Sequence, residues 1–231
     1  MQKNNESKVD RIEIEYFTDP LCCWSWAFEP HWRKFIIENK HLIHWNYRMG
    51  GMISDWNNYS DPLNDISRPA QMAPLWMQAK YTTNSDINPD IWLEDPPHSS
   101  IPACLAVKSA EIQSTAAADI LLFLLRKAVM TEKKNIAKWD IIIELAKEAG
   151  KRYNFFDFNL FQSKLESSEV LNLLRTDLQK AKLNDIGRFP TLTMSKADGM
   201  GLIITGYRPY SVLTEAFKQL TDVMEHQHNK L

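Results

Sequence analysis

The chain has little of what marks a disulfide-rich, nucleic-acid-binding or membrane protein. It has only three cysteines in 231 residues, too few for the disulfide framework of a small secreted domain. Its 27 Lys and Arg residues nearly balance 29 Asp and Glu residues, which gives no indication of a basic surface for nucleic acid or an anionic membrane. No apolar run is long enough to span a bilayer. We therefore expect a soluble protein with an ordinary packed core.

Signals for metal, phosphate and export are also missing. There is no Gly-rich phosphate loop, and residues 1–10 lack the apolar core of a signal peptide. The C-terminal His226-Gln-His228 is interpreted as a solvated tail. No metal-ligand spacing relates the histidines before it, which are His31, His41, His44 and His98. Together with the few cysteines, this predicts a cytoplasmic protein without a metal or a tightly bound cofactor.

Hydrophobic patterning predicts a small sheet made from the two ends of the chain. The first part reads as strand, helix and strand, which implies two parallel strands with a right-handed crossover. Two more strands and a helix follow near the C-terminus. The expected strands are 12–17, 42–49, 191–195 and 201–205, and the expected helices of this part are 26–39 and 211–226.

The middle of the chain, residues 52–185, shows no convincing strand. Its segments 55–65 and 82–97 are rich in Asn, Asp and Pro and are expected to be loops. The expected helices are 69–80, 100–113, 116–130, 137–149, 159–167 and 168–183, with a serine cap before Pro102 and Gly150 as the stop of the fourth.

This order predicts an α/β architecture in which a helical block interrupts a small mixed sheet. Residues 11–51 and 186–226 are assigned to the sheet domain, and 52–185 to the inserted helical subdomain. Residues 1–10 and 227–231 are expected to be flexible termini.

The most informative residue is Cys22, in the turn between the first strand and the first helix. Backbone N–H groups and the helix dipole favour an anion there, which lowers a thiol pKa and makes a nucleophile. A buried, unreactive thiol is the alternative. A dithiol site would have a second cysteine at position 25, but that residue is Ser25.

Four segments at the corners of this architecture match one known family. Asp19-Pro20-Leu21-Cys22 precedes the first helix, and Gly187-Arg188-Phe189-Pro190-Thr191-Leu192 precedes the third strand. Residues 101–110 contain Pro102-Ala103, and residues 206–209 introduce the last helix. With these motifs the chain resembles the DsbA-like branch of the thioredoxin superfamily over residues 12–217. The cytosolic members look most similar: FrnE-type oxidoreductases and the bacterial Spx-degradation adaptor.

The resemblance implies a thioredoxin-like mixed sheet interrupted by a large helical insertion. It implies a cis bond before Pro190, which would face Cys22, with Arg188, Phe189 and Trp24 around the substrate groove. An extended substrate would pair with the backbone of Phe189 as an added strand.

Three positions depart from the family pattern. Ser25 replaces the resolving cysteine, Cys23 stands where many members have proline, and Phe189 replaces the usual valine or threonine. Ser25 is expected to donate a hydrogen bond to the Cys22 sulfur but is too weak an acid to release a mixed disulfide. Cys23 is a candidate second thiol, although packing is its expected role, and Cys104 is expected to lie in the core.

Three functions remain open from the sequence. The first is a thiol-disulfide oxidoreductase or isomerase that acts through Cys22 alone, on protein or peptide thiols, with glutathione as co-substrate. The second is a non-catalytic adaptor whose loops 55–65 and 82–97 bind a partner protein. The third is an enzyme like the kappa-class glutathione transferases, in which Ser25 or Cys22 activates glutathione.

Overall fold

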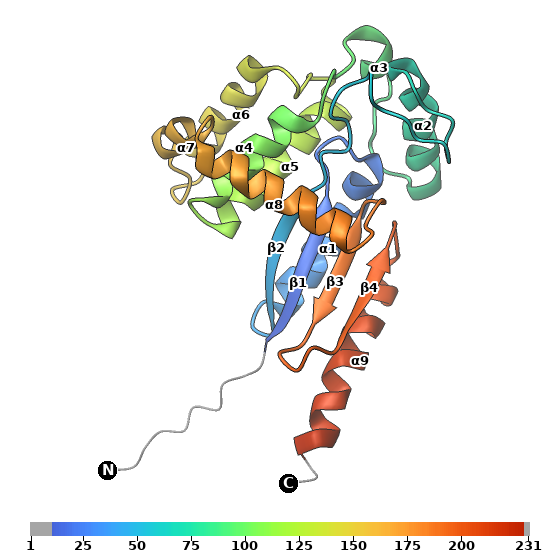
Figure 1. Cartoon of the computed structure of the whole chain (residues 1–231), viewed down its shortest axis with the longest axis vertical. Coiled ribbons are helices and arrows are strands. Elements are labelled where there is room, and N and C mark those ends of the chain that lie inside the picture. Colours follow the sequence, from blue (N-terminus) through green and yellow to red (C-terminus); the bar gives the residue numbers. More distant parts are fainter. Residues whose placement is uncertain (1–10, 229–231) are drawn as a thin grey trace.

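The computed structural model describes residues 11–228, with side chains up to residue 221, and centres on one four-stranded sheet (Figure 1). The strand order is β2-β1-β3-β4. Strands β1 (Ile12–Thr18) and β2 (Ile43–Met49) are parallel, and β3 (Thr191–Ser195) is antiparallel to β1 and to β4 (Gly201–Thr205). The sheet is mixed, and the two ends of the chain build it together, as the sequence predicts.

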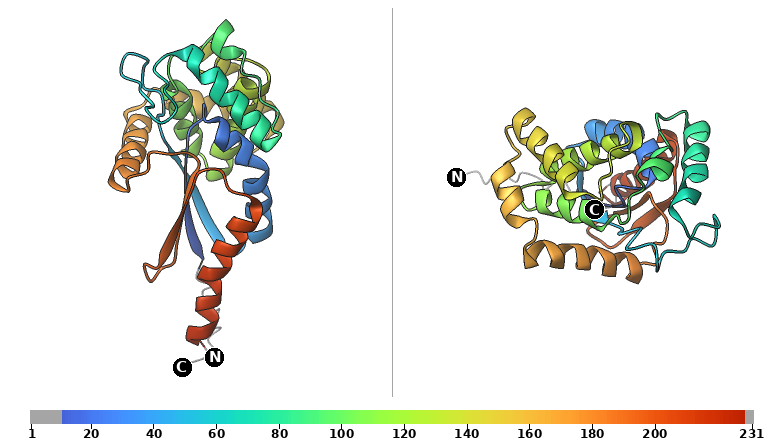
Figure 2. Two further views of the ribbon diagram at one scale, coloured as in Figure 1. Left: turned by 90° about the vertical axis from the view of Figure 1, so that its right-hand side faces the viewer. Right: turned by 90° about the horizontal axis from the view of Figure 1, so that it is seen from above.

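Helices cover both faces of the sheet, but not equally. The helices α1 (Cys23–Asn39) and α9 (Tyr210–His228) lie on one face, where the alternating side chains of β1, such as Ile14 and Tyr16, are buried (Figure 2). The opposite face is crossed by α8 (Ser168–Leu183) at one end of the strands. Helix α9 includes residues 227 and 228, whereas 1–10 and 229–231, also expected to be flexible, lie outside the described residues.

The helical block gathers at the end of the sheet where β1 and β2 finish (Figure 1). Between residues 52 and 185 the described chain has no strand, only an isolated bridge between Asp61 and Ile66. None of the described helices is both long and apolar enough to cross a membrane. The helices of the block are α2 (Met72–Thr83) after a short 3-10 turn (Pro69–Gln71), α3 (Ile91–Glu94), α4 (Ile101–Glu111), α5 (Thr115–Thr131), α6 (Trp139–Arg152), α7 (Phe158–Lys164) and α8.

The predicted stop of a helix at Gly150 is wrong. Gly150 does not stop α6, which continues to Arg152. A Cβ on Gly150 would lie 3.2 Å from Phe158 Cβ, so the missing side chain lets α7 approach α6 closely. The N-cap residue of α4 is Ser100, and the side chain of the preceding Ser99 accepts a hydrogen bond from Ile101 N at 3.1 Å.

The block is attached to the sheet by Asp19, which is fully buried after β1. Its Oδ1 accepts a hydrogen bond from Leu21 N at 2.9 Å, within the turn that leads to α1. Its Oδ2 accepts from Met52 N at 2.7 Å, after β2, and from Ser100 Oγ at 2.9 Å, at the start of α4. One carboxylate therefore joins three segments that surround the β1–α1 turn.

A second buried carboxylate holds α8 against β2. Asp177 accepts hydrogen bonds from Met49 N at 3.0 Å and from Arg48 Nη1 at 3.1 Å, and Lys108 Nζ of α4 lies 2.8 Å from it. Lys108 and Asp177 are both buried. Each buried charge thus has an opposite partner, as burial requires.

Candidate functional site

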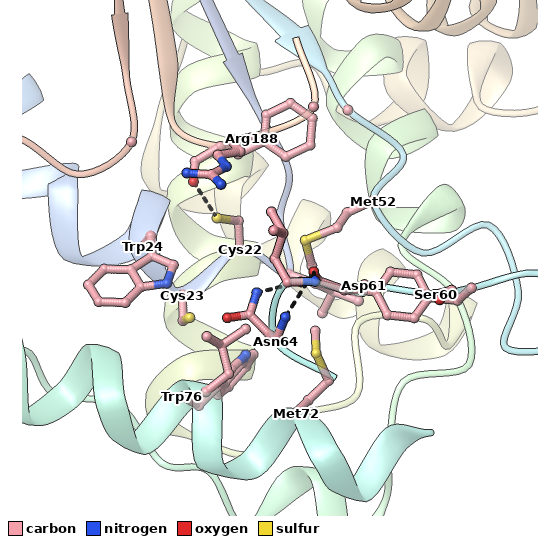
Figure 3. A pocket seen from close by; sticks show the side chains of 18 of the residues that line it. Cys22, Cys23, Trp24, Met52, Ser60, Asp61, Asn64, Met72, Trp76 and Arg188 are labelled. Carbon is pink, nitrogen blue, oxygen red and sulfur yellow. Dashed lines mark hydrogen bonds between the residues drawn. The ribbon is translucent and has the colours of Figure 1, made fainter. Parts of the chain in front are cut away.

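Cys22 occupies the N-cap of α1, where the sequence predicts it. Its sulfur accepts a hydrogen bond from Ser25 N at 3.4 Å, which satisfies one of the free N–H groups at the helix start. The thiol also contacts Phe189, whose carbonyl oxygen lies 3.5 Å from Cys22 Sγ. Figure 3 shows this contact next to Arg188. The fold therefore brings together two motifs that are 167 residues apart.

The segment that faces Cys22 contains a cis peptide bond between Phe189 and Pro190. Thr191 Oγ1 donates a hydrogen bond to Arg188 O at 2.8 Å, which closes the turn before β3. Pro190 is buried and does not line the cleft described next. Arg188 is exposed at the cleft, and Phe189 is half-buried.

A cleft of about 1070 Å³ opens above Cys22 (Figure 3). Of the predicted site residues, Cys22, Cys23, Trp24, Arg188 and Phe189 line it, whereas Ser25 and Pro190 do not. The sequence did not predict the other residues that line the cleft. Many of them are apolar or aromatic, and they include Met52, Met72, Trp76 and Tyr207.

Ser54 and residues 58–64 form one wall of the cleft, so most of the expected loop at 55–65 belongs to the site. Asp55 Oδ1 accepts hydrogen bonds from the backbone N–H groups of Asn57 and Asn58, and Asp61 Oδ1 accepts from Leu63 N. These are short-range bonds within the loop, typical of Asx turns. Leu63 is 73% exposed at the wall, which leaves an apolar side chain available to a partner.

The electrostatics of Cys22 are opposite to the expectation. The side chain is only 5% exposed, and burial raises the pKa of the thiol above its ordinary value. Ser25, through its side chain and its backbone N–H, and the positive charge of Arg126 act against this rise without reversing it. The predicted lowering of the Cys22 pKa is therefore wrong, because desolvation outweighs the effect of the helix terminus.

The role of the Ser25 hydroxyl toward Cys22 stays a prediction. The Ser25 side chain is buried, and Oγ has no hydrogen-bond partner among the described residues. The contact with the Cys22 sulfur comes from the Ser25 backbone N–H, which any residue at this position would provide. The hydroxyl of Tyr16 is likewise buried without a partner, and burial raises its pKa to about 12.

The other two thiols are packed in the interior. Burial raises the pKa of Cys23 and of Cys104 well above the ordinary value. Cys104 Sγ lies 3.5 Å from Asp19 Oδ2, so it packs against the carboxylate that holds the β1–α1 turn. Within residues 11–221, no cluster of three or more His, Cys, Asp or Glu side chains is arranged to hold a metal.

Beneath the site lies a buried charge network that the sequence did not reveal. Arg126 Nη1 donates to Glu29 Oε2 at 2.9 Å, and its Nη2 contacts Thr18 Oγ1. Glu29 also pairs with Arg33 at 2.7 Å. The guanidinium of Arg126 lies 5.8 Å from the ring centroid of Tyr16. An arginine inside the most apolar helix was the available signal, since a charge buried there requires a partner.

Known proteins match both the sequence and the fold. The family model described as Thioredoxin matches residues 16–215. The chain belongs to this family. The ClpXP adapter protein SpxH of Halalkalibacterium halodurans is 30% identical over 217 residues, which cover 93% of this chain and 69% of that protein. SpxH of Bacillus subtilis is 26% identical over 216 residues, 91% of this chain and 68% of that protein. The chain is a DsbA-like protein of the SpxH branch.

Solved structures agree on the fold of this thioredoxin-family protein. A candidate protein disulfide isomerase of Nitrosomonas europaea superposes with a TM-score of 0.75 at 23% identity, covering 95% of this chain and 100% of that one. The cytosolic disulfide reductase DsbM of Pseudomonas aeruginosa gives 0.66 at 17% identity, with 95% and 100% covered. At these identities the likeness establishes the DsbA-like fold alone.

Proposed function

We propose that this protein is an adaptor that binds a client protein in the cleft above Cys22 and presents it to a protease. The relatives that match at 30% and 26% identity are ClpXP adapter proteins, and they match over most of this chain. The client suggested by the resemblance is Spx, and the protease is ClpXP. A cytosolic place of action belongs to this proposal and suits three free thiols.

The contrast between the cleft and its thiol carries the proposal. The cleft has the size and the apolar lining of a binding site, about 1070 Å³. Its thiol is poorly suited to exchange, because Cys22 is buried with a raised pKa and Ser25 cannot act as a resolving thiol. The cleft therefore supports client binding better than it supports disulfide turnover.

The cleft offers contacts of the kind that dominate protein interfaces. The rings of Trp24 and Tyr207 are 6.3 Å apart, and Tyr207 OH is 3.1 Å from His31 Nε2, which fixes its orientation. Large aromatic side chains and arginine are frequent hot spots. The exposed guanidinium of Arg188 is placed to pair with a client carboxylate.

The test is degradation of purified Spx by purified ClpXP with and without this chain. We expect the chain to shorten the half-life of Spx severalfold, and Cys22→Ala to do so equally well. An unchanged half-life with the intact chain would refute the proposal for this client and protease. Loss of the effect with Cys22→Ala would refute a thiol-independent adaptor.

Cleft variants give the site-specific part of the test. Trp24→Ala and Arg188→Ala should each weaken Spx binding, measured by titration calorimetry. The matched control is Trp139→Ala, because this exposed tryptophan lies on α6 and does not line the cleft. Equal effects of Trp24→Ala and Trp139→Ala would place the binding surface elsewhere.

Monothiol disulfide exchange is the second candidate function, favoured by the position of Cys22 Sγ at a helix N-cap and at the cleft wall. In this reaction the Cys22 thiolate attacks a substrate disulfide, a mixed disulfide forms, and the other substrate sulfur leaves as a thiolate. Glutathione thiolate is the proposed co-substrate: it attacks the substrate sulfur of the mixed disulfide, joins the substrate in a new disulfide and releases the Cys22 thiolate.

Alkylation of Cys22 against pH separates the two functions, with Cys22→Ser as the blank. If the protein is an adaptor, the pH midpoint of Cys22 alkylation should lie above the ordinary cysteine pKa of about 8.5. A midpoint well below that value, together with a Cys22–glutathione adduct in the mass spectrum, would favour exchange. Glutathione binding without any adduct or disulfide turnover would favour the transferase-like alternative.

A further inference from the structure

Strand β4 is an edge strand of the sheet. Among the described residues it pairs only with β3, in the register Thr191 to Thr205 and Ser195 to Gly201. Proteins usually protect such edges with charges, bulges or a covering segment, because a free edge can pair with another chain. Figure 1 shows β4 at the border of the sheet, beside α9.

The hydrogen bonds to β3 show which backbone groups of β4 remain free. Gly206 N donates to Pro190 O at 2.7 Å, and Lys196 N donates to Met200 O at 2.8 Å. In an antiparallel pair, residues with bonds to the neighbour alternate with residues whose bonds point away. Even-numbered residues of β4 therefore face β3, and the N–H and C=O groups of Gly201, Ile203 and Thr205 point outward.

The free edge is also apolar. Ile203, at the centre of the strand, is 60% exposed, and Val212 at the start of α9 is 38% exposed. Both residues line a groove of about 570 Å³. Its lining is mostly aliphatic and includes Leu202, Ile203, Ile204, Val212 and Ala216.

We propose that two copies of this chain associate through their β4 edges as antiparallel strands related by a twofold axis at Ile203. In this register Ile203 faces its own copy and Gly201 faces Thr205, so every outward N–H and C=O of one strand meets its complement. The two sheets then form one continuous eight-stranded sheet. Val212 and the groove of each copy face the other across the same axis. This proposal is independent of the adaptor function.

The charges at the ends of β4 favour a second copy over other occupants. In this antiparallel arrangement the turn between β3 and β4 of one copy, which carries Asp198, lies at the end of the interface where the other copy's chain leaves β4 toward Arg208. Arg208 forms no ion pair within residues 11–221, and Asp198 has only Lys196, 3.6 Å away, as an ionic partner. The twofold axis places one Asp198–Arg208 pair at each end of the interface.

A disulfide test reads the register directly. Paired residues on antiparallel strands have Cα atoms about 5.5 Å apart, which suits a disulfide. Under oxidation, Ile203→Cys should therefore give a cross-linked dimer on a non-reducing gel. Thr205→Cys is the matched control, because its two copies would be about 14 Å apart, four residues of strand. Equal dimer yields from the two variants would overturn the proposal.

Charge reversal tests the interface without a cross-link. Light scattering on the intact chain should give twice its mass of 26.9 kDa at high concentration. Arg208→Asp and Asp198→Arg should each shift the midpoint of dissociation to higher protein concentration, and the double variant should restore it. A monomeric mass at every concentration, or a double variant as weak as the single ones, would contradict the proposal.

Discussion

The ring of Phe189 packs directly against the backbone of Gly50. A Cβ on Gly50 would lie 2.1 Å from Phe189 Cζ, closer than any two side chains can approach. Gly50 itself is fixed, because its N–H donates to Thr18 O at 2.7 Å at the end of β1. The absence of a side chain at position 50 therefore sets where the ring of Phe189 lies in the cleft, next to its carbonyl contact with Cys22.

Replacing Gly50 by alanine should move Phe189 and disturb the cleft. We expect a loss of stability of about 1–3 kcal/mol from overpacking. Client affinity should fall about tenfold, or about 1.4 kcal/mol. The measurements are urea unfolding and calorimetric titration with Spx. Gly187→Ala is the control, because a Cβ there would meet nothing within 4 Å although Gly187 also lines the cleft. Equal losses in both variants would contradict this role of Gly50.

The sequence predicts the sheet well because its strands carry clear alternation and clear stops. Strands β3 and β4 and helix α8 begin and end at the expected residues. Helix α3 (Ile91–Glu94) was missed, because four residues inside a segment rich in Asp and Pro are too short to show a helical period. Such an element is stabilised by its buried side chains, Ile91 and Trp92, which only the tertiary structure provides.

The site was predictable where a motif defined it and unpredictable where distant segments meet. The motifs implied that Pro190 would face Cys22, and the structure brings the preceding residue of the same segment, Phe189, to Cys22 through its carbonyl oxygen. The burial of Cys22 could not be read from the turn alone, since it depends on neighbours from other parts of the chain. The Arg126–Glu29 pair joins residues 97 apart and leaves no periodic signal in the sequence.

Ser25→Cys should convert the monothiol site into a dithiol site. The backbone N–H of residue 25 already lies 3.4 Å from Cys22 Sγ. Replacing the Ser25 hydroxyl breaks no hydrogen bond among the described residues. Treatment with oxidised glutathione should therefore remove two titratable thiols in this variant. Ser25→Ala should lose none to an internal disulfide. Thiol counting after denaturation checks both, and an unoxidised Ser25→Cys variant would show that the two side chains diverge.

Arg126→Ala should be among the most destabilising single changes in the chain. It leaves Glu29 buried beneath the site without this partner, at a cost of about 3–5 kcal/mol. The matched control is Arg152→Ala, whose partner Glu148 lies 2.9 Å away on the surface of α6. That exposed pair contributes about 0.5 kcal/mol or less. Urea unfolding of both variants measures the difference, and similar values would show that the buried network does not stabilise the fold.

Alkaline pH should destabilise the folded chain. Burial raises the pKa of Cys22, Cys23 and Cys104 above the ordinary value, and that of Tyr16 to about 12. In the unfolded chain the thiols lose their protons near pH 8.5, about the ordinary value, so above that pH the unfolded state binds fewer protons than the folded state. The free energy of unfolding must then fall as pH rises.

The slope of this decline distinguishes the thiols from other titrating groups. Each thiol that ionises only on unfolding contributes about 1.4 kcal/mol per pH unit. Stability should be nearly constant from about pH 7 to about pH 8 and should decrease above about pH 8.5. Cys22→Ser removes one such group, so its slope should be shallower by about 1.4 kcal/mol per pH unit. Urea unfolding at several pH values measures both slopes, and parallel curves for the two proteins would mean that Cys22 ionises as readily in the folded chain as in the unfolded one.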